Sequence, residues 1–208
     1  MMSREWKHRN SIRKFNREME ILKAKIRILE TNPFSNLPKE NYYKTIVVDF
    51  PWIIPTASWR QKPPYPTMSP KEMEDMHIDR YAAKNAHLYL WAITAMPLEP
   101  IMIIKSMPDF RISGKLYWKK THFGLGYNYR NIMEEVFFCT KGKLRISRRN
   151  AANFLEAKRG LGGHSSKPDE FYALVESCSP GPYLDIFGRV NRPGWDVWGP
   201  NGMFYGSK

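Results

Sequence analysis

Short apolar runs alternate with amphipathic segments along most of this chain of 208 residues. The runs have the length and the β-branched and aromatic content of buried strands, and lie at residues 44–50, 86–93, 114–120, 135–142, 183–188 and 195–199. Helices are predicted between them at residues 69–77, 98–107 and 167–179. This alternation predicts an α/β fold with a mostly parallel central sheet flanked by helices.

Two of the apolar runs carry a carboxylate at the end where such sheets bind ligands, outside the carboxyl ends of their strands. "TIVVDFPW" delivers Asp49 followed by Phe-Pro-Trp, and "YLDIFG" carries Asp185. An exocyclic amine on a nucleobase is a poor nucleophile because its lone pair is delocalised. A carboxylate and a backbone carbonyl that accept its two N–H bonds would favour a pyramidal nitrogen, and the carboxylate could take the departing proton. A plain strand end with a packed tryptophan fits the same residues, so both interpretations stay open.

Residues 1–30 are interpreted as a basic amphipathic helix ahead of a domain at residues 31–208. Apolar side chains recur there at spacings of three and four, at Ile12, Phe15, Met19, Leu22, Ile26 and Leu29. A linker rich in Pro and Asn then breaks the helix. Packing on its own domain, a dimer contact and a phosphate-binding arm are all compatible with this stripe.

The formal net charge of +13 favours a polyanionic partner, with nucleic acid ahead of an anionic membrane. No run of 18 apolar residues is present, so no membrane span is expected. The N-terminus lacks the apolar core of a signal peptide, which favours a cytoplasmic protein. The five histidines are scattered, so no metal site is expected, and Cys139 and Cys178 are typical of buried thiols. The basic run at residues 141–149 fits either a solvated segment or a set of phosphate contacts.

Nine segments follow one another in the order typical of a known enzyme family. They are "VVDFPW", "YPTMS", "AHLYLWAI", "YWKK", "GLGYNYR", "EEVFFCTKGK", "HSSKPDEFYALVE", "SPGPYLDIFGR" and "RPGWDVWG". In this series the chain resembles the MT-A70 family of S-adenosylmethionine-dependent adenine-N6 methyltransferases of DNA or RNA. The resemblance covers residues 44–202. It implies a Rossmann-like methyltransferase fold in which the catalytic motif precedes the cofactor-binding "DIFGR", with S-adenosylmethionine as the cofactor.

The resemblance also implies roles for the tetrapeptide after the first predicted strand. Asp49 and the backbone carbonyl of Phe50 would hold the target amine. Pro51 and Trp52 would shape the slot that receives it. Tyr65, in the proline-rich loop that follows, would close over the adenine as part of a gate.

Further residues match positions that line the family's pocket. Those on the substrate side are Glu134, Ser165 and Lys167. Those on the cofactor side are Asp49, Lys167, Phe187, Gly188, Arg189, Asn191, Arg192 and Asn201. Judged without the family, Lys167 also fits a solvated helix start, and Glu134 also fits a surface ion pair.

Phe50 departs from the family pattern, because it stands where the motif usually has its first proline. The carbonyl survives this change, but the restriction that proline places on φ does not. Pro200 stands where many relatives have asparagine, so Asn201 is the candidate for that cofactor contact. The family includes partner subunits with degenerate motifs, so a non-catalytic nucleic-acid-binding subunit is one alternative to an enzyme.

We expect an active adenine-N6 methyltransferase that acts on DNA. The chain is short, has no recognisable RNA-binding module and resembles compact prokaryotic or phage-like members of the family. RNA is the close alternative substrate, and cytosine-N4 methylation is a weaker one. A homodimer or a heteromeric methyltransferase complex is compatible with the sequence, as is the nucleus in place of the cytosol if the source is eukaryotic.

Overall fold

The computed structural model describes residues 38–53, 66–124, 129–160 and 166–198, with the helical positions Ser11, Ile12, Phe15 and Met19. Its strands are β1 (Tyr43–Val48), β2 (Ala82–Ala92), β3 (Phe110–Gly124), β4 (Asn131–Lys141), β5 (Phe154–Ala157), β6 (Tyr183–Ile186) and β7 (Trp195–Trp198). Its helices are α2 (Pro70–Glu74), the 3-10 helix η1 (Ile78–Tyr81), α3 (Glu99–Lys105) and α4 (Asp169–Cys178). None of the described helices is both long enough and apolar enough to cross a membrane.

The described strands form one seven-stranded sheet in the order β5-β3-β4-β2-β1-β6-β7. β4 is antiparallel to its neighbours β2 and β3, and every other neighbouring pair is parallel. The mostly parallel α/β sheet that the sequence predicts is therefore confirmed, with one reversed strand. Six strands end at one edge, which we call the carboxyl edge, and β4 begins there. The opposite edge is called the amino edge.

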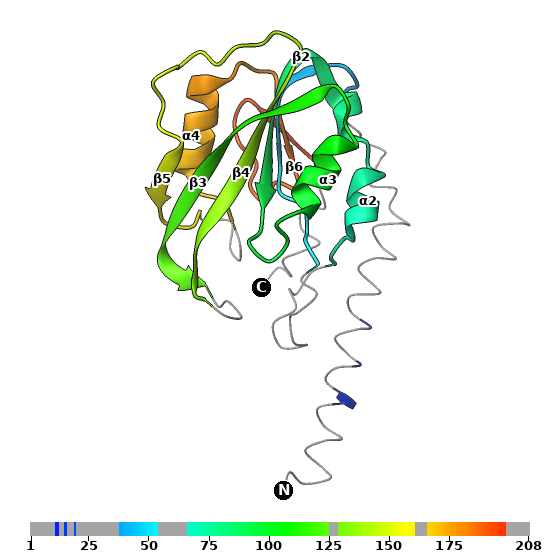
Figure 1. The fold of residues 1–208 in the computed structure, drawn as a ribbon, viewed down its shortest axis with the longest axis vertical. Coiled ribbons are helices and arrows are strands. Elements are labelled where there is room, and N and C mark those ends of the chain that lie inside the picture. The colour runs from blue at the N-terminus through cyan, green and yellow to red at the C-terminus, as the bar shows by residue number, and fades with distance from the viewer. Residues whose placement is uncertain are drawn as a thin grey trace, which may run out of the picture.

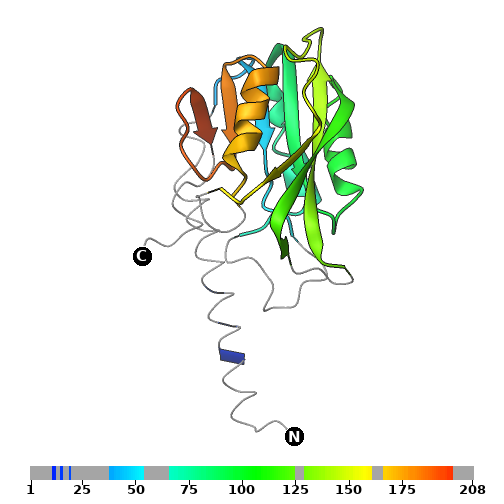
Figure 2. The same cartoon turned by 90° about the vertical axis from the view of Figure 1, so that its left-hand side faces the viewer.

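Helices cover both faces of the sheet, α4 on one side and α2 and α3 on the other (Figures 1 and 2). Residues of β2 alternate between the two apolar clusters that result. Leu88 and Leu90 belong to the larger cluster, whereas Tyr89 and Trp91 belong to the cluster that includes Phe171 of α4. Burial on both faces explains why this strand reads as a continuous apolar run rather than an alternating one.

β1 lies where the order of the strands reverses direction along the chain. It pairs with β2, the next strand in sequence, on one side and with the much later β6 on the other. Val48 at its end lies opposite Leu90 and Ile186. In open α/β sheets, the crevice outside the carboxyl ends at such a switch point is where ligands bind. Asp49 follows β1 at this point.

The helix start predicted at Ser69 is confirmed in detail. The Ser69 side chain accepts a hydrogen bond from the Glu72 backbone N–H at 3.3 Å. The Glu72 carboxylate in turn accepts one from the Ser69 backbone N–H at 2.7 Å. This reciprocal capping box satisfies two helix-terminal N–H groups, with Pro70 at the first helical position.

Three structural features differ from the sequence expectation or extend it. β5 and η1 were not predicted, since each is only four residues long and two of the four residues of β5 are exposed. β3 and β4 extend beyond the predicted residues 114–120 and 135–142. The basic run at residues 141–149 follows the end of β4, so the reversal of that strand places it at the amino edge, away from Asp49.

Only four positions of the predicted N-terminal helix are described. Ser11, Ile12, Phe15 and Met19 are helical, as expected. The side chains of Ile12, Phe15 and Met19 are 46%, 61% and 36% exposed, so these members of the apolar stripe are not buried against the domain. The other positions of the helix, and the proposed boundary near residue 30, lie outside the described residues.

Gly142 allows the turn after β4 to approach β2 closely. Its φ is +69°, and a Cβ built there would lie 2.6 Å from the Lys84 carbonyl oxygen and against the Asn85 side chain. We expect Gly142→Ala to lower the free energy of unfolding by more than about 1 kcal/mol, because both the backbone and the contact become strained. Urea unfolding of the full chain measures this.

Gly114 provides the matched control for the same substitution. A Cβ built at Gly114 meets nothing within 4 Å, and its φ lies outside the left-handed region. Gly114→Ala should therefore leave the free energy of unfolding unchanged or slightly higher. Equal losses for the two variants would contradict the packing at Gly142.

Candidate active site

Two chain segments meet at the carboxyl edge, beyond the ends of β1 and β6. The backbone N–H of Asp49 donates a hydrogen bond to the carbonyl of Ile186 at 3.3 Å, which ties the two segments together. A cavity opens between them. Its walls are formed by Asp49, Ser166, Lys167, Tyr172, Asp185, Phe187, Gly188, Arg189, Val190 and Arg192.

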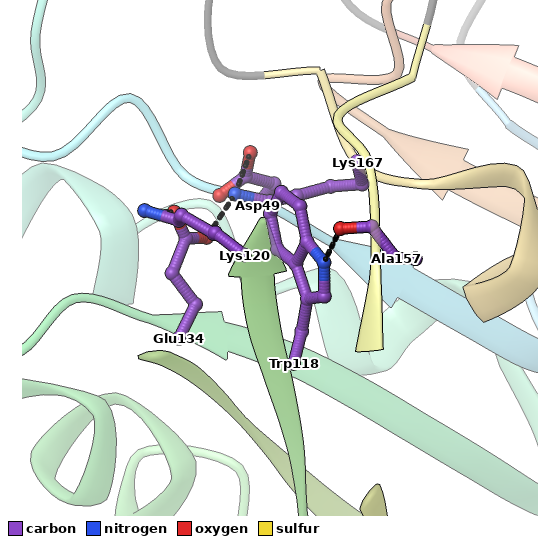
Figure 3. Close-up of polar contacts among 6 residues, drawn as sticks. All are labelled: Asp49, Trp118, Lys120, Glu134, Ala157 and Lys167. Carbon is purple, nitrogen blue, oxygen red and sulfur yellow. Dashed lines mark hydrogen bonds and ion pairs between the residues drawn. The ribbon is translucent and has the colours of Figure 1, made fainter. Parts of the chain in front are cut away.

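A chain of ion pairs runs from Asp49 across the sheet (Figure 3). The Lys167 ammonium lies 3.0 Å from Oδ2 of Asp49 and 2.8 Å from Oε2 of Glu134. The other oxygen of Glu134 lies 2.6 Å from the ammonium of Lys120. Carboxylates and ammonium groups therefore alternate from β1 to β3. The three side chains Lys167, Glu134 and Asp49 are only 5%, 13% and 15% exposed, so solvent screens them little.

Burial and charge pairing set the protonation of this chain. Burial alone would raise the pKa of Glu134, but Lys167 and Lys120 outweigh it and lower this pKa to about 2. Burial alone would lower the pKa of Lys167, but Asp49 and Glu134 raise it, so the ammonium stays charged.

Asp49 differs from Glu134 in the direction of its shift. Burial raises the pKa of the Asp49 carboxyl, and the Glu134 charge adds to this effect, while Lys167 and Arg189 oppose it. Its conjugate base therefore binds a proton more readily than an ordinary aspartate. A carboxylate of this kind suits proton acceptance at moderate pH.

Two tryptophans hold the ammonium of Lys167 in place. It lies 4.6 Å from the centroid of the Trp91 ring, within cation–π range. Trp118 packs edge-on against Trp91 with centroids 5.9 Å apart. The Trp118 indole N–H donates to the Ala157 carbonyl at 3.0 Å, which fixes this ring to β5 (Figure 3).

Phe50 occupies the position of the motif proline without disrupting the local backbone. Its carbonyl accepts a hydrogen bond from the Trp52 N–H at 2.9 Å, a tight turn that fixes the direction of the carbonyl. Its ring is 2% exposed and packs 6.0 Å from Trp52 and 5.7 Å from Phe187, between ring centroids. Aromatic packing therefore restrains this residue where proline would restrict φ. The Pro51 carbonyl accepts from the Met68 N–H at 2.8 Å, which ties Met68 to the motif.

The loop after β6 is closely packed at its first two residues. Phe187 has a φ of +64°, and its N–H donates to the Trp198 carbonyl at 2.6 Å. A Cβ built at Gly188 would lie 2.5 Å from Oδ2 of Asp185 and 2.8 Å from Val197. Glycine is needed there because the loop folds back against the strand that precedes it.

Asp185 and Tyr172 form a buried pair on the α4 side of the cavity. The Tyr172 hydroxyl donates to Asp185 at 2.8 Å. Burial raises the pKa of Asp185 to about 7, although the bond from Tyr172 opposes this. Arg192 lies 3.7 Å from the Tyr172 ring centroid and 2.6 Å from a carboxylate oxygen of Asp169, so it clamps the loop to α4.

Most of the predicted site residues converge on this cavity. The ones that line it are Asp49, Lys167, Phe187, Gly188, Arg189 and Arg192, and Glu134 contacts it through Lys167. Phe50, Pro51 and Trp52 are buried beside it. Asn191 is exposed and does not line it. Tyr65, Ser165 and Asn201 lie outside the described residues.

Lys120, Tyr172 and Trp91 contribute to the site but are not among the residues predicted for it. Lys120 was quoted within "YWKK", but a lysine in a strand carries no sign of its partner on the neighbouring strand. Tyr172 and Trp91 have the apolar surroundings of ordinary core residues. The alignment of a helix, a strand and a loop around the cavity is what gives them their contacts.

Glu134→Gln tests the buried ion-pair chain. A carboxyl with a pKa lowered from 4.5 to about 2 stabilises the fold fully above pH 4.5, and this contribution is lost as the pH falls toward 2. We expect the variant to lower the free energy of unfolding by about 3 kcal/mol at pH 7, and by progressively less below pH 4.5. Urea unfolding at several pH values measures both.

Glu156→Gln, on β5, is the matched control. Glu156 pairs with Lys119 at the same 2.8 Å, but its side chain is 50% exposed. Such a surface pair contributes less than about 1 kcal/mol. If both variants lost the same stability, the buried chain would have no special role.

Comparison with known proteins agrees with this arrangement. The model of the MT-A70 family matches residues 43–201, which include β1 to β7 and the whole cavity. The Type II methyltransferase M.MunI of a Mycoplasma species is 26% identical over 196 aligned residues, which cover 80% of each chain. The family match extends over more than half of the chain. The chain therefore belongs to the MT-A70 family of methyltransferases.

Proposed function

We propose that this methyltransferase transfers the methyl group of S-adenosylmethionine to the exocyclic N6 amine of adenine, in DNA. The observation that supports this most is the buried carboxylate of Asp49, held by Lys167 at the mouth of the cavity. Its raised pKa matches the task of accepting a proton from a weakly basic amine. The family and the sequence pattern support adenine as the base.

The tetrapeptide supplies two acceptors for the two N–H bonds of the amine. One is the Asp49 carboxylate. Its Oδ2 contacts Lys167, and its other oxygen is the one that would accept from the amine. The other is the Phe50 carbonyl, which keeps one lone pair beyond its bond to Trp52. Two such bonds favour a pyramidal nitrogen with a localised lone pair, directed away from both acceptors.

The methyl transfer balances with Asp49 as the proton acceptor. When bound, S-adenosylmethionine supplies a methyl group whose bond to the sulfonium sulfur breaks as the bond to N6 forms. The nitrogen becomes positively charged, and Asp49 takes one of its protons. Lys167 and Glu134 keep the carboxylate in position during this step.

The residues around the cavity fit a ligand of that chemistry. The carboxylates Asp49 and Asp185 suit a cationic centre, and the ammonium of Lys167 and the guanidinium of Arg189 suit an α-carboxylate. Phe187 presents an aromatic ring for a flat base. We assign the cofactor to Phe187, Gly188, Arg189 and Lys167. Arg192 acts by holding the loop, and Asn191 and Asn201 complete the set that the family implies.

Nucleic acid is the substrate class that fits the charge of the chain best. The formal net charge is +13, and the matched relative is named a Type II methyltransferase. We assign the base-facing positions to Tyr65, Glu134 and Ser165, with Pro51 and Trp52 shaping the slot. DNA is chosen over RNA because the sequence carries no recognisable RNA-binding module.

Asp49→Asn tests the catalytic assignment. We expect DNA from cells that express the wild type to contain N6-methyladenine by mass spectrometry, and kcat of the variant to fall at least about 100-fold. The pKa of Asp49 is higher in the folded than in the unfolded protein, so the fold disfavours the charged form. The contribution of this group to the free energy of unfolding therefore falls as the pH rises from the unfolded pKa to the folded pKa. The neutral amide should therefore leave the free energy of unfolding at pH 8 no lower than in the wild type.

Asp109→Asn is the control for the same chemical change. Asp109 is exposed and pairs with Lys141 at the amino edge, so its loss should leave kcat unchanged. Methylated adenine found in the RNA fraction alone would identify RNA, and not DNA, as the substrate. N4-methylcytosine would identify cytosine, and not adenine, as the target base. Oligonucleotide binding without S-adenosylmethionine binding, measured by calorimetry, would favour the non-catalytic subunit instead.

The pH dependence of kcat gives a second test of Asp49. Only the ionised carboxylate accepts the proton, so kcat should fall as the pH falls through the raised pKa, above the usual range of an aspartate. Because the Glu134 charge contributes to raising this pKa, Glu134→Gln should shift the acid limb to lower pH. Circular dichroism over the same range checks that the fold persists. An acid limb that does not move in the variant would remove Asp49 as the titrating group.

A further inference from the structure

Both edges of the sheet carry cationic side chains. Near the carboxyl edge, several of them are paired with carboxylates, while Arg130, Lys158 and Arg159 are exposed and form no ion pair with the described residues. The pairs are Lys119 with Glu156, Lys120 with Glu134, Lys167 with Asp49 and Glu134, and Arg192 with Asp169. Such pairs cancel much of the field that an approaching polyanion would meet.

The exposed cations of the amino edge include five near the end of β4 that form no ion pair within the described part of the chain. They are Lys84, Lys143, Arg145, Arg148 and Arg149, which we call the amino-edge basic surface. Four of them lie within seven positions of the segment between β4 and β5. Figure 1 shows this segment running along the end of the sheet and over α4.

Main-chain contacts hold this segment in place. The Ser147 N–H donates to the Cys178 carbonyl at 2.8 Å, at the end of α4. The Lys143 N–H donates to the Asn85 side chain at 2.7 Å, which brings Lys143 beside Lys84. Backbone N–H groups of the segment therefore make the contacts to the end of α4 and to β2. The charged groups of the side chains remain free to meet a ligand.

We propose that the amino-edge basic surface binds nucleic-acid phosphates, as a contact separate from the catalytic cavity. The choice of partner rests on the proposed function. At about 3.3 Å per residue, the stretch of β4 from Glu134 to Lys141 spans about 23 Å. The surface therefore lies too far from Asp49 to touch the target base. It binds a more distant part of the same nucleic acid, or a second strand.

The composition of the surface fits phosphates better than a protein partner. Protein interfaces depend on apolar or aromatic anchors at their centre. The apolar residues between these cations, Leu144 and Ile146, are half-buried, and none of the exposed large hydrophobic side chains of the described residues lies in residues 142–150. Three arginines suit bidentate phosphate contacts, which need no apolar anchor. Binding here is therefore independent of sequence and sensitive to salt.

The test is the salt dependence of duplex binding by the full chain without cofactor. Each phosphate contact contributes about 0.9 to the slope of log K against log salt. Arg148→Gln/Arg149→Gln should reduce the slope by about 1 to 2, and adding Lys143→Gln/Arg145→Gln should reduce it by about 2 to 4. The loss should be seen with a duplex long enough to reach both edges, and kcat on a short duplex should be unchanged.

Lys39→Gln/Lys105→Gln is the matched control, since it removes two exposed charges that form no ion pair with the described residues and lie outside this surface. Its slope should stay within about 0.5 of the wild type. The inference is overturned if the four-residue variant keeps the wild-type slope, or if the control loses as much per charge. Because binding is measured without methyl transfer, a failure of methylation would count against the proposed function and leave this result standing.

Discussion

The contact on which the site depends is one buried ammonium group between two buried carboxylates. Lys167 reaches Asp49 from the segment before α4, and it reaches Glu134 across the sheet. Of the two partners, Glu134 contributes most to stability, because its pKa is lowered to about 2, and removing its charge costs about 3 kcal/mol. The fold therefore has to keep β1, β4 and the start of α4 in register. The Lys167 ammonium packs on the ring of Trp91, which in turn packs against Trp118. The aromatic side chains on the α4 side of the sheet are therefore part of the same arrangement.

The reversal of β4 is what makes this contact possible. In a wholly parallel sheet, the start of this strand would lie at the amino edge, and Glu134 with it. Because β4 runs the other way, its first residues lie beside the ends of β2 and β3. The same reversal sends the basic segment after β4 to the amino edge. One choice of strand direction thus places Glu134 and the basic segment after β4 at opposite edges of the sheet.

The parts of this structure that depend on local patterns could be predicted from the sequence. Asp49 could be predicted because a carboxylate that ends an apolar run falls at a known edge, and Ser69 because a capping box is a short-range signal. Lys120 could not, because its partner is set by a register across β3 and β4 that includes bulges. The direction of β4 also left no local trace. The sequence therefore did not show that the basic run at residues 141–149 lies at the amino edge.

Phe50 links two parts of the site that a proline would leave separate. Its ring touches Phe187, the first residue of the loop assigned to the cofactor, while its carbonyl belongs to the slot assigned to the amine. A displacement of the loop would therefore press on the ring of a residue whose carbonyl is held by Trp52. Aromatic contact thus gives the proposed cofactor loop and the proposed amine slot a shared side chain, which a proline at this position would not provide.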